Sequence, residues 1–516
     1  MKKTIAVLLA LFMLISLAAC GGTVAPTTAG PTDGSTAPTT ATPTTVQEDP
    51  YEIVVELINY GMEIPDLALI EEKVNEIILP EINCTMKFKT VAVADQFMKL
   101  SLWVAGGEKV DLAMTGITTN PANLIGQGCL QPMTQYINNS KILTDLAADY
   151  LAACTFNGEI YAYPGILYPA MGMSYLYRSD LAAEHNITVP SHVDSADELE
   201  SVFAAIKASG MNQYALTLGD GRMATQTILQ YSFDALNDSS FESHGVIMNG
   251  DTTNKIIDIF ESQQYRDKVL QLRDWYNKGY IDTLSYSNTY SSHDSMANDT
   301  SFGFYSTIGA GSNVAYWSGT TGKPLAECTI GDKTISSSGV TNMSWGIPTT
   351  CEQPEKVIKF MEVMFTNTDL ANLLNYGIEG KHYVKVEGTE QIIKYPEGLN
   401  AFSAGYGTFI NWYGDTQKTW HMQPLTDEFI AQLGGFTKAG GAIVSPSFGY
   451  SFDTANVTTE LAALTAVIDE FRSPLECGVV EDVNGQLEKF TKALKDAGID
   501  KVIAENQAQF DAWVKK

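Results

Sequence analysis

Strand and helix patterns alternate along residues 51–116, and this alternation limits the possible folds more than any other feature. Residues 51–58, 84–91 and 110–116 each read as a strand. Residues 66–82 space apolar side chains at helical intervals, and residues 94–108 give an amphipathic helix that ends at two glycines. Strands joined through helices form a parallel sheet with right-handed crossovers, so the expected fold class is α/β.

The carboxyl ends of these strands are where a parallel sheet binds its ligand. The first strand is followed by Asn59 and Tyr60, and Thr115 lies at the carboxyl end of the third. The alternating pattern therefore predicts that these three residues lie at a binding site.

Composition and charge exclude several classes of protein. About 465 residues follow the N-terminal region, which is more than one core organises, so we expect two lobes. The formal net charge of −28 argues against nucleic acid or an anionic membrane surface as a partner.

The chain has six histidines without a close pair and no CxxC pair, so no metal and no cofactor are expected. The six cysteines after Cys20 leave one or two disulfides possible, with their pairing open.

The N-terminus predicts export. Two lysines precede an apolar run at residues 5–19 that is too short for a stable membrane span. Leu17-Ala18-Ala19-Cys20 resembles the lipobox of bacterial lipoproteins, which implies cleavage before Cys20 and a diacylglycerol on its thiol. The alternative is an ordinary secretory signal that happens to contain a cysteine.

Residues 20–49 consist mostly of Thr, Pro, Gly, Ala and Ser and cannot bury enough surface to fold. We expect a signal peptide at 1–19 and a disordered tether at 20–49. A lipid anchor followed by a tether predicts a location on the extracellular face of the cell membrane. The length of the tether favours a Gram-positive envelope.

Five stretches resemble extracellular solute-binding proteins of bacterial ABC importers, in particular the group with sugar-binding members, and they occur in the same order. They are FMKLSLWVAGGEKVDLA, GCLQPMTQYI, FNGEIYAYP, YLYRSDLAAEHNITVP and SWGIPTTCEQPEKVIKFMEVMFTN. The stretch LLNYGIEGKHYVKVEG resembles a C-terminal region of one lipoprotein subgroup whose ligands are mostly unassigned. Val110 departs from the family, which often has proline there, whereas Asp111 is kept.

This resemblance implies two α/β lobes joined by crossing segments, with the ligand in the cleft between them and closure by hinge motion. Carried onto this chain, the crossings fall near 164–168, near 300–308 and after residue 367. The first lobe is then 50–164 with 302–366, and the second is 165–301 with 367–516.

A sugar cleft needs aromatic faces for stacking and polar side chains for directional hydrogen bonds. Aromatic and polar residues at strand ends, at crossings and in glycine-rich loops meet this need. With the three strand-end residues, the predicted ligand-binding set is completed by Tyr168, Asp220, Arg222, Tyr305, Trp345, Trp412 and Tyr450. Each of these side chains also has a structural alternative in a core or a surface turn.

No catalytic motif stands out: the chain has no HExxH, no GxSxG and no phosphate-binding loop. We therefore expect a monomeric binding protein that is not an enzyme and that delivers a small solute, most simply an oligosaccharide, to an ABC permease with a separate ATPase. Two alternatives stay open. One is a surface glycan hydrolase or lyase, and the other is a sensing subunit for a non-sugar ligand such as a peptide.

Overall fold

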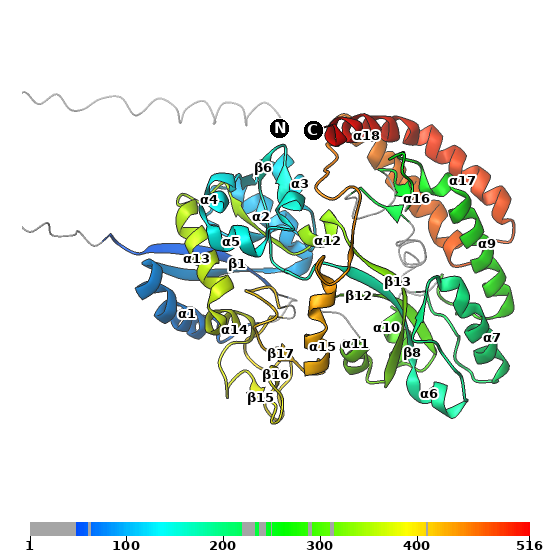
Figure 1. Ribbon diagram of the computed structural model, residues 1–516, viewed down its shortest axis with the longest axis horizontal. Coiled ribbons are helices and arrows are strands. Elements are labelled where there is room, and N and C mark those ends of the chain that lie inside the picture. The colour runs from blue at the N-terminus through cyan, green and yellow to red at the C-terminus, as the bar shows by residue number, and fades with distance from the viewer. Residues whose placement is uncertain are drawn as a thin grey trace, which may run out of the picture. The chain divides into compact units, whose positions relative to one another are not determined.

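Residues 48–59, 63–218, 233–236, 244–248, 250–286, 291–309, 314–408 and 411–515 are described by a computed structural model, drawn in Figure 1. Strand β1 (Tyr51–Asn59) pairs in parallel with β2 (Cys84–Ala92) along its whole length. A parallel bridge from Val55 to Leu112 brings the third strand, β3 (Ala113–Met114), to the other side of β1. The connecting helices are α1 (Leu67–Ile82) and α2 (Gln96–Ala105). The predicted alternation is confirmed, although β3 is only two residues long.

Antiparallel strands complete the first lobe. Strand β14 (Ser344–Pro348) pairs with β3, β4 (Leu130–Gln131) and β7 (Tyr163–Pro164). Helix α13 (Pro354–Thr366) places a continuous apolar stripe on this core, as its 3.6-residue spacing requires. The smaller elements of this lobe are α3 (Pro121–Gly126), α4 (Thr134–Asn139), α5 (Lys141–Leu146), β5 (Thr155–Phe156) and β6 (Glu159–Ile160).

The second lobe has its own sheet, in the order β12 (Gly303–Ile308), β8 (Met171–Arg178), β13 (Leu325–Ile335) and β18 (Ile443–Val444), with β9 (His192–Val193) also beside β13. One face of this sheet packs on an aromatic core that contains Tyr175, Phe203 and Trp275. The helices of this lobe are α6 (Ser179–Glu184), α7 (Glu200–Ala208), α9 (Gln263–Lys278), α10 (Ser292–Ala297) and α11 (Val314–Thr321).

The C-terminal helices form a separate apolar cluster. They are α16 (Thr458–Glu476), α17 (Val483–Ala497) and α18 (Ile499–Val514), and they pack with α9 and with the β10 (Phe233–Asp234) and β11 (Ile247–Met248) pair. Figure 1 shows them in orange and red beside the green helix α9. Inside this cluster the rings of Phe471 and Phe490 stack at 5.3 Å.

The chain passes between the two sheets at three places. It leaves β7 for β8 through residues 165–170, returns from β13 to β14 through α12 (Ser337–Thr341), and leaves again near β18. The predicted boundaries at 302 and 367 do not coincide with these passages. Strand β12 lies in the second sheet, and residues after 367 still contribute to the first core, including Leu374, Trp412 and Phe436.

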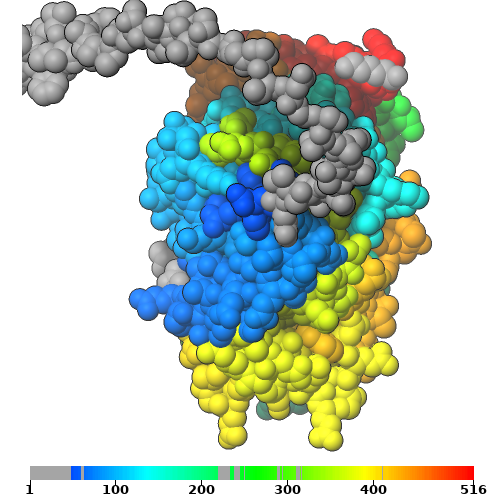
Figure 2. Space-filling model, turned by 90° about the vertical axis from the view of Figure 1, so that its left-hand side faces the viewer, coloured from blue at the N-terminus to red at the C-terminus, as the bar shows by residue number. Residues whose placement is uncertain are grey.

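The stretch between α13 and β18 holds five further helices and strands. They are α14 (Thr368–Tyr376), β15 (Val384–Lys385), β16 (Ile392–Lys394), β17 (His421–Met422) and α15 (Asp427–Ala431). Figure 2 views the side of the molecule formed by the blue and cyan N-terminal elements and this yellow stretch. The stretch between α13 and β18 therefore contributes to the first lobe.

Three observations bear on the sequence expectations. The six cysteines at 84, 129, 154, 328, 351 and 477 are buried, and none of these six is joined to another by a disulfide. Among the described residues, no cluster of three metal-ligating side chains occurs. Within the same ranges, no helix combines the length and apolar character needed to cross a bilayer.

Candidate functional site

The carboxyl ends of parallel strands mark one edge in each lobe. In the first lobe β1 ends at Asn59, and β3 ends at Met114. In the second lobe, parallel bridges place Leu216 beside Ile281 and Thr217 beside Phe304. Ligands of α/β sheets bind beyond such edges, so the two edges outline where a solute would be held.

A buried carboxyl group supports the first-lobe edge. Glu56 on β1 is 1% exposed and accepts hydrogen bonds from Gln96 Nε2 at 3.1 Å and from the Met114 backbone N–H at 3.1 Å. Burial raises the pKa of this carboxyl to about 8, although both hydrogen bonds lower it. Gln96 in turn accepts a hydrogen bond from Thr118 at 2.6 Å. The network joins β1, the start of α2 and the loop after β3 at the predicted binding edge.

The hydroxyl group of Thr115 is engaged inside the protein. It lies 2.7 Å from the Ser344 hydroxyl and 3.1 Å from the Ser344 carbonyl, and Thr115 is fully buried. At the next residue, Gly116, an added Cβ would lie 1.8 Å from the Asn342 carbonyl oxygen, so only glycine fits. In this conformation Thr115 therefore ties the loop after β3 to β14.

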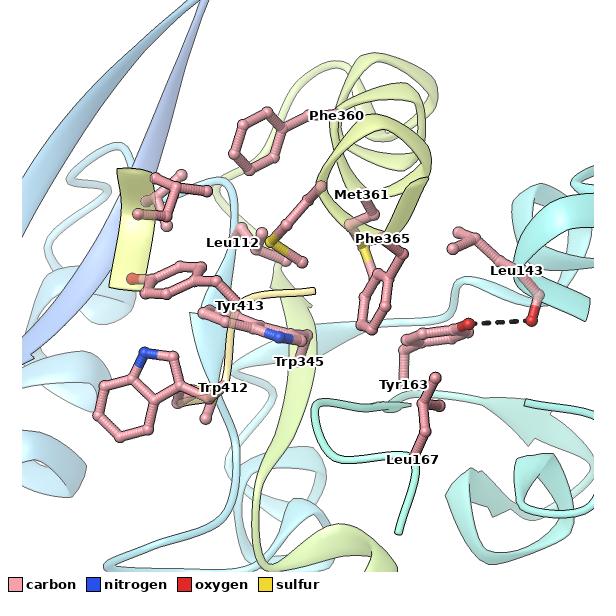
Figure 3. Close-up of a cluster of buried hydrophobic side chains, with 14 of the residues drawn as sticks. Leu112, Leu143, Tyr163, Leu167, Trp345, Phe360, Met361, Phe365, Trp412 and Tyr413 are labelled. Atoms are coloured by element: carbon pink, nitrogen blue, oxygen red, sulfur yellow. Dashed lines mark hydrogen bonds between the residues drawn. The ribbon is translucent and has the colours of Figure 1, made fainter. Parts of the chain in front are cut away.

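Trp345, Trp412 and Tyr413 form a tight aromatic cluster in the first lobe, shown in Figure 3. The rings of Trp345 and Tyr413 lie 5.2 Å apart, and those of Trp412 and Tyr413 lie 6.3 Å apart. All three side chains are at most 1% exposed. The indole N–H groups of Trp345 and Trp412 and the hydroxyl of Tyr413 have no well-formed hydrogen bond within the described ranges. Burial raises the pKa of Tyr413, and the nearby Trp412 indole lowers it. Buried donors without an acceptor are uncommon, and a ligand hydroxyl is one group that could satisfy them.

The other predicted tyrosines lie in three different environments. Tyr168 is in the first passage between the lobes, and its hydroxyl donates to Asp415 at 3.2 Å. Tyr305 lies in the second-lobe core against Tyr175, where its hydroxyl has no partner in the described structure. Tyr450 packs into the C-terminal cluster, and its hydroxyl donates to Asn506 at 2.6 Å.

The structure therefore brings Trp345 and Trp412 together and keeps Tyr305 and Tyr450 apart from them in other cores. Cys20, Tyr60, Asp220 and Arg222 lie outside the described residues. In this conformation Tyr450 is buried and its hydroxyl is bonded to Asn506, so it offers no surface to a ligand. Its ring anchors the glycine-rich loop to the C-terminal cluster.

A pocket of about 300 Å³ lies between the second-lobe sheet and a loop of the first lobe. The sheet contributes residues of β8, β12 and β13, and the loop contributes Gly435, Gly440, Gly441 and Ala442. Ala442 and the neighbouring Phe436 belong to the first core. We call it the interlobe pocket. Its lining includes five glycines, at 172, 331, 435, 440 and 441, and two charged residues, Asp332 and Lys333. Its volume is that of small-ligand sites, and its glycines leave backbone rather than side chains around the space.

The sequence patterns gave no indication of Glu56 or Lys333. Glu56 lies within the otherwise apolar run 53–58 of β1. Lys333 stands in β13, the longest strand within the described ranges, which no sequence pattern had indicated. A charged residue inside an otherwise buried strand is the signal that could have identified Glu56.

The fold is that of the two-lobed solute-binding proteins. The computed model is similar to the crystal structure of the N-glycan transport solute binding protein NgtS from Streptococcus pneumoniae, with a TM-score of 0.77 and 23% identity, covering 90% of this chain and 99% of that one. It is also similar to an HMO-binding, ABC-transporter-associated solute binding protein from Bifidobacterium longum infantis, with a TM-score of 0.61 and 12% identity over 91% and 100% of the two chains.

Sequence comparison gives a consistent result. The chain is 24% identical over 477 residues to a carbohydrate ABC transporter substrate-binding protein of Streptococcus pneumoniae serotype 4, covering 90% of this chain and 91% of the relative. Residues 446–515 match the family described as Domain of unknown function (DUF3502), which agrees with the predicted C-terminal resemblance. The proteins that the chain resembles are transporter binding subunits and not enzymes.

Proposed function

We propose that this protein is the lipid-anchored, extracellular substrate-binding subunit of an ABC importer and that it captures an oligosaccharide. The observation that carries the proposal is the similarity, over nine-tenths of both chains, to a carbohydrate ABC transporter substrate-binding protein. Similarity over this length includes both lobes and the passages between them, so it bears on the whole binding device and not on one motif.

The ligand class is supported by what the similar structures bind. NgtS has been crystallised with Man1GlcNAc and with Man5GlcNAc, and against those complexes the TM-scores are 0.68 and 0.65 at the same identity. The NgtS structure described without a glycan gives 0.77, so this chain agrees better with that arrangement. We infer that this chain changes conformation around a glycan, with the aromatic cluster and the interlobe pocket as its binding surfaces.

The N-terminal features support the location. A lipid on Cys20 would keep the lobes near one membrane, and the tether would allow them to collect ligand nearby. Such tethering raises the effective concentration of the binding protein at its permease. Because the sequence has no phosphate-binding loop, ATP hydrolysis is assigned to a separate subunit.

The ligand class is tested by a thermal-shift screen of the purified protein with oligosaccharides, peptides and nucleosides. A ligand at one hundred times its Kd should stabilise the fold by about 2.7 kcal/mol. Stabilisation by oligosaccharides alone is expected. Stabilisation by a peptide and by no sugar would favour a sensing or peptide-uptake role, and release of shortened glycans would favour the hydrolase or lyase alternative.

The anchor is tested separately by expressing the full chain and its Cys20→Ser variant in a Gram-positive host. The parent protein should fractionate with membranes and give an N-terminal peptide whose mass includes a diacylglycerol. The variant should be recovered from the medium. Recovery of the parent protein from the medium without added lipid mass would exclude the anchor and leave the ligand assignment untouched.

A further inference from the structure

Strand β13 is interrupted where it lines the interlobe pocket. Its pairing with β8 runs regularly to Ile330, opposite Met173, and resumes at Thr334, opposite Met171. Residues 331–333 therefore face the single residue Gly172, and Gly331 takes the left-handed conformation with φ +61°. Bulges of this kind re-aim side chains and are common beside binding sites.

The bulge directs Lys333 toward the pocket. An added Cβ on Gly172 would lie 3.2 Å from Lys333 Cγ, so the stem of the lysine packs along the glycine. At the other end, Lys333 Nζ lies 4.1 Å from the centroid of the Phe436 ring. The second lobe thus extends an ammonium group across the pocket to an aromatic ring of the first-lobe loop.

This ammonium group carries no counter-charge in contact with it. Among the described residues, Lys333 makes no ion pair and no hydrogen bond, and it is partly buried. Two carboxyl groups of the same strand, Glu327 and Asp332, form no ion pair with it. Glu327 accepts from Ser174 at 3.3 Å, and burial raises its pKa more than the attraction of Lys333 lowers it. Asp332 is exposed and has no partner in the same ranges. An unpaired charge in a partly enclosed pocket favours a ligand that brings the opposite charge.

We propose that the interlobe pocket binds an acidic sugar unit, with Lys333 pairing with its carboxylate. The carboxylate supplies the missing counter-charge, and the glycines of the lining leave room for the sugar ring beside it. Asp332 accepts hydrogen bonds from the hydroxyl groups of the same unit, which is why an acidic sugar suits the lining better than a simple anion. The inference rests on the proposed function and names the substrate class within it.

The experiment is an array of neutral glycans and of glycans that carry uronic or sialic acid, probed with the parent protein and followed by calorimetry on the binders. Acidic glycans are expected among the binders. Lys333→Gln should weaken their binding roughly tenfold or more, because a charge-assisted contact is lost, whereas neutral glycans should change less than about threefold. Lys333→Arg, which keeps the charge, should retain most of the affinity.

The matched control is Lys385→Gln. Lys385 also lies over an aromatic ring, that of Trp420 at 4.9 Å, but it is outside the pocket lining. It should leave both glycan classes unaffected. Binding of neutral glycans alone would overturn the acidic-sugar proposal and leave the proposed function standing. Equal losses for both classes in Lys333→Gln would also overturn it, because Lys333 would then only hold the two lobes together. Binding of no glycan would contradict the proposed function itself.

Discussion

Gln96 Nε2 donates to Glu56 Oε2 at 3.1 Å, and both side chains are fully buried at the edge where β1 and β3 end. The amide of Gln96 also donates to the Met114 carbonyl at 2.9 Å. A carboxyl group thus stands at the junction of two strands and a helix, inside the lobe that carries the aromatic cluster. The arrangement makes the stability of this junction depend on the protonation of one residue.

The first prediction concerns pH. The Glu56 carboxyl has a pKa of about 8 when folded and about 4.3 when unfolded. Between these values the folded protein binds the extra proton, so stability falls as pH rises, by at most about 1.4 kcal/mol per pH unit. The contribution is complete below pH 4.3 and is lost as pH passes 8. Glu56→Gln should remove this dependence, seen as a flatter plot of urea midpoint against pH from 5 to 8.

The control for Glu56→Gln is Glu108→Gln, which changes an exposed carboxylate paired with Lys89. Its pH profile should follow that of the parent protein. Parallel profiles for the parent and Glu56→Gln would contradict a protonated Glu56.

The second prediction concerns the passage between the lobes. Tyr168→Phe removes the hydrogen bond to Asp415 and should cost about 1 kcal/mol of stability. Tyr163→Phe is a matched control, since the Tyr163 hydroxyl donates to the Leu143 carbonyl at 3.0 Å inside the first core. Both variants should be similarly destabilised in urea. If Tyr168 belongs to the binding surface, calorimetry should show at least a threefold loss of glycan affinity for Tyr168→Phe only. Unchanged affinity in both would remove Tyr168 from the site.

Local patterns were enough to predict the first part of the fold. The strands near 51–58 and 84–91 and the helix that follows each of them are indicated by alternation, helical spacing and glycine stops, all of which act within a few residues. Ser195 and Glu198, three residues apart, form a capping box at the start of a helical turn, which is another local feature. Such features depend on neighbours in sequence, so tertiary packing had little to override.

Features that depend on distant packing could not be predicted in this way. Nothing local indicates that residues after 367 remain in the first core, because that choice is made by contacts with α1 and α13. Likewise, Tyr450 in a glycine-rich loop looks available, yet it is buried against Phe510 at 4.9 Å. The ammonium of Lys333 reaches its pocket only because of a bulge, which is a property of two paired strands.

The third prediction concerns the aromatic cluster. Trp412→Phe keeps a ring but removes the indole N–H, which has no well-formed hydrogen bond in the described structure. If a glycan hydroxyl accepts from this group, affinity should fall roughly tenfold. Trp275→Phe is the matched control, since Trp275 is equally buried and its N–H also lacks a partner there, but it belongs to the second-lobe core. Calorimetry with one bound oligosaccharide should separate them, and equal affinities would argue against a ligand contact by Trp412.

The last prediction concerns the junction that leads into the C-terminal helices. Asp234 is 7% exposed and accepts from the Ser447 backbone N–H at 2.9 Å, from the Ser447 hydroxyl at 2.7 Å and from the Ser445 hydroxyl. Asp234→Ala should cost about 3 kcal/mol, because it leaves several donors buried without an acceptor. Hydrogen exchange should accelerate in residues 443–450 more than in β1. Asp453→Ala, which removes an exposed loop carboxylate, is the control, and equal urea midpoints for the two variants would show that Asp234 does not hold this junction.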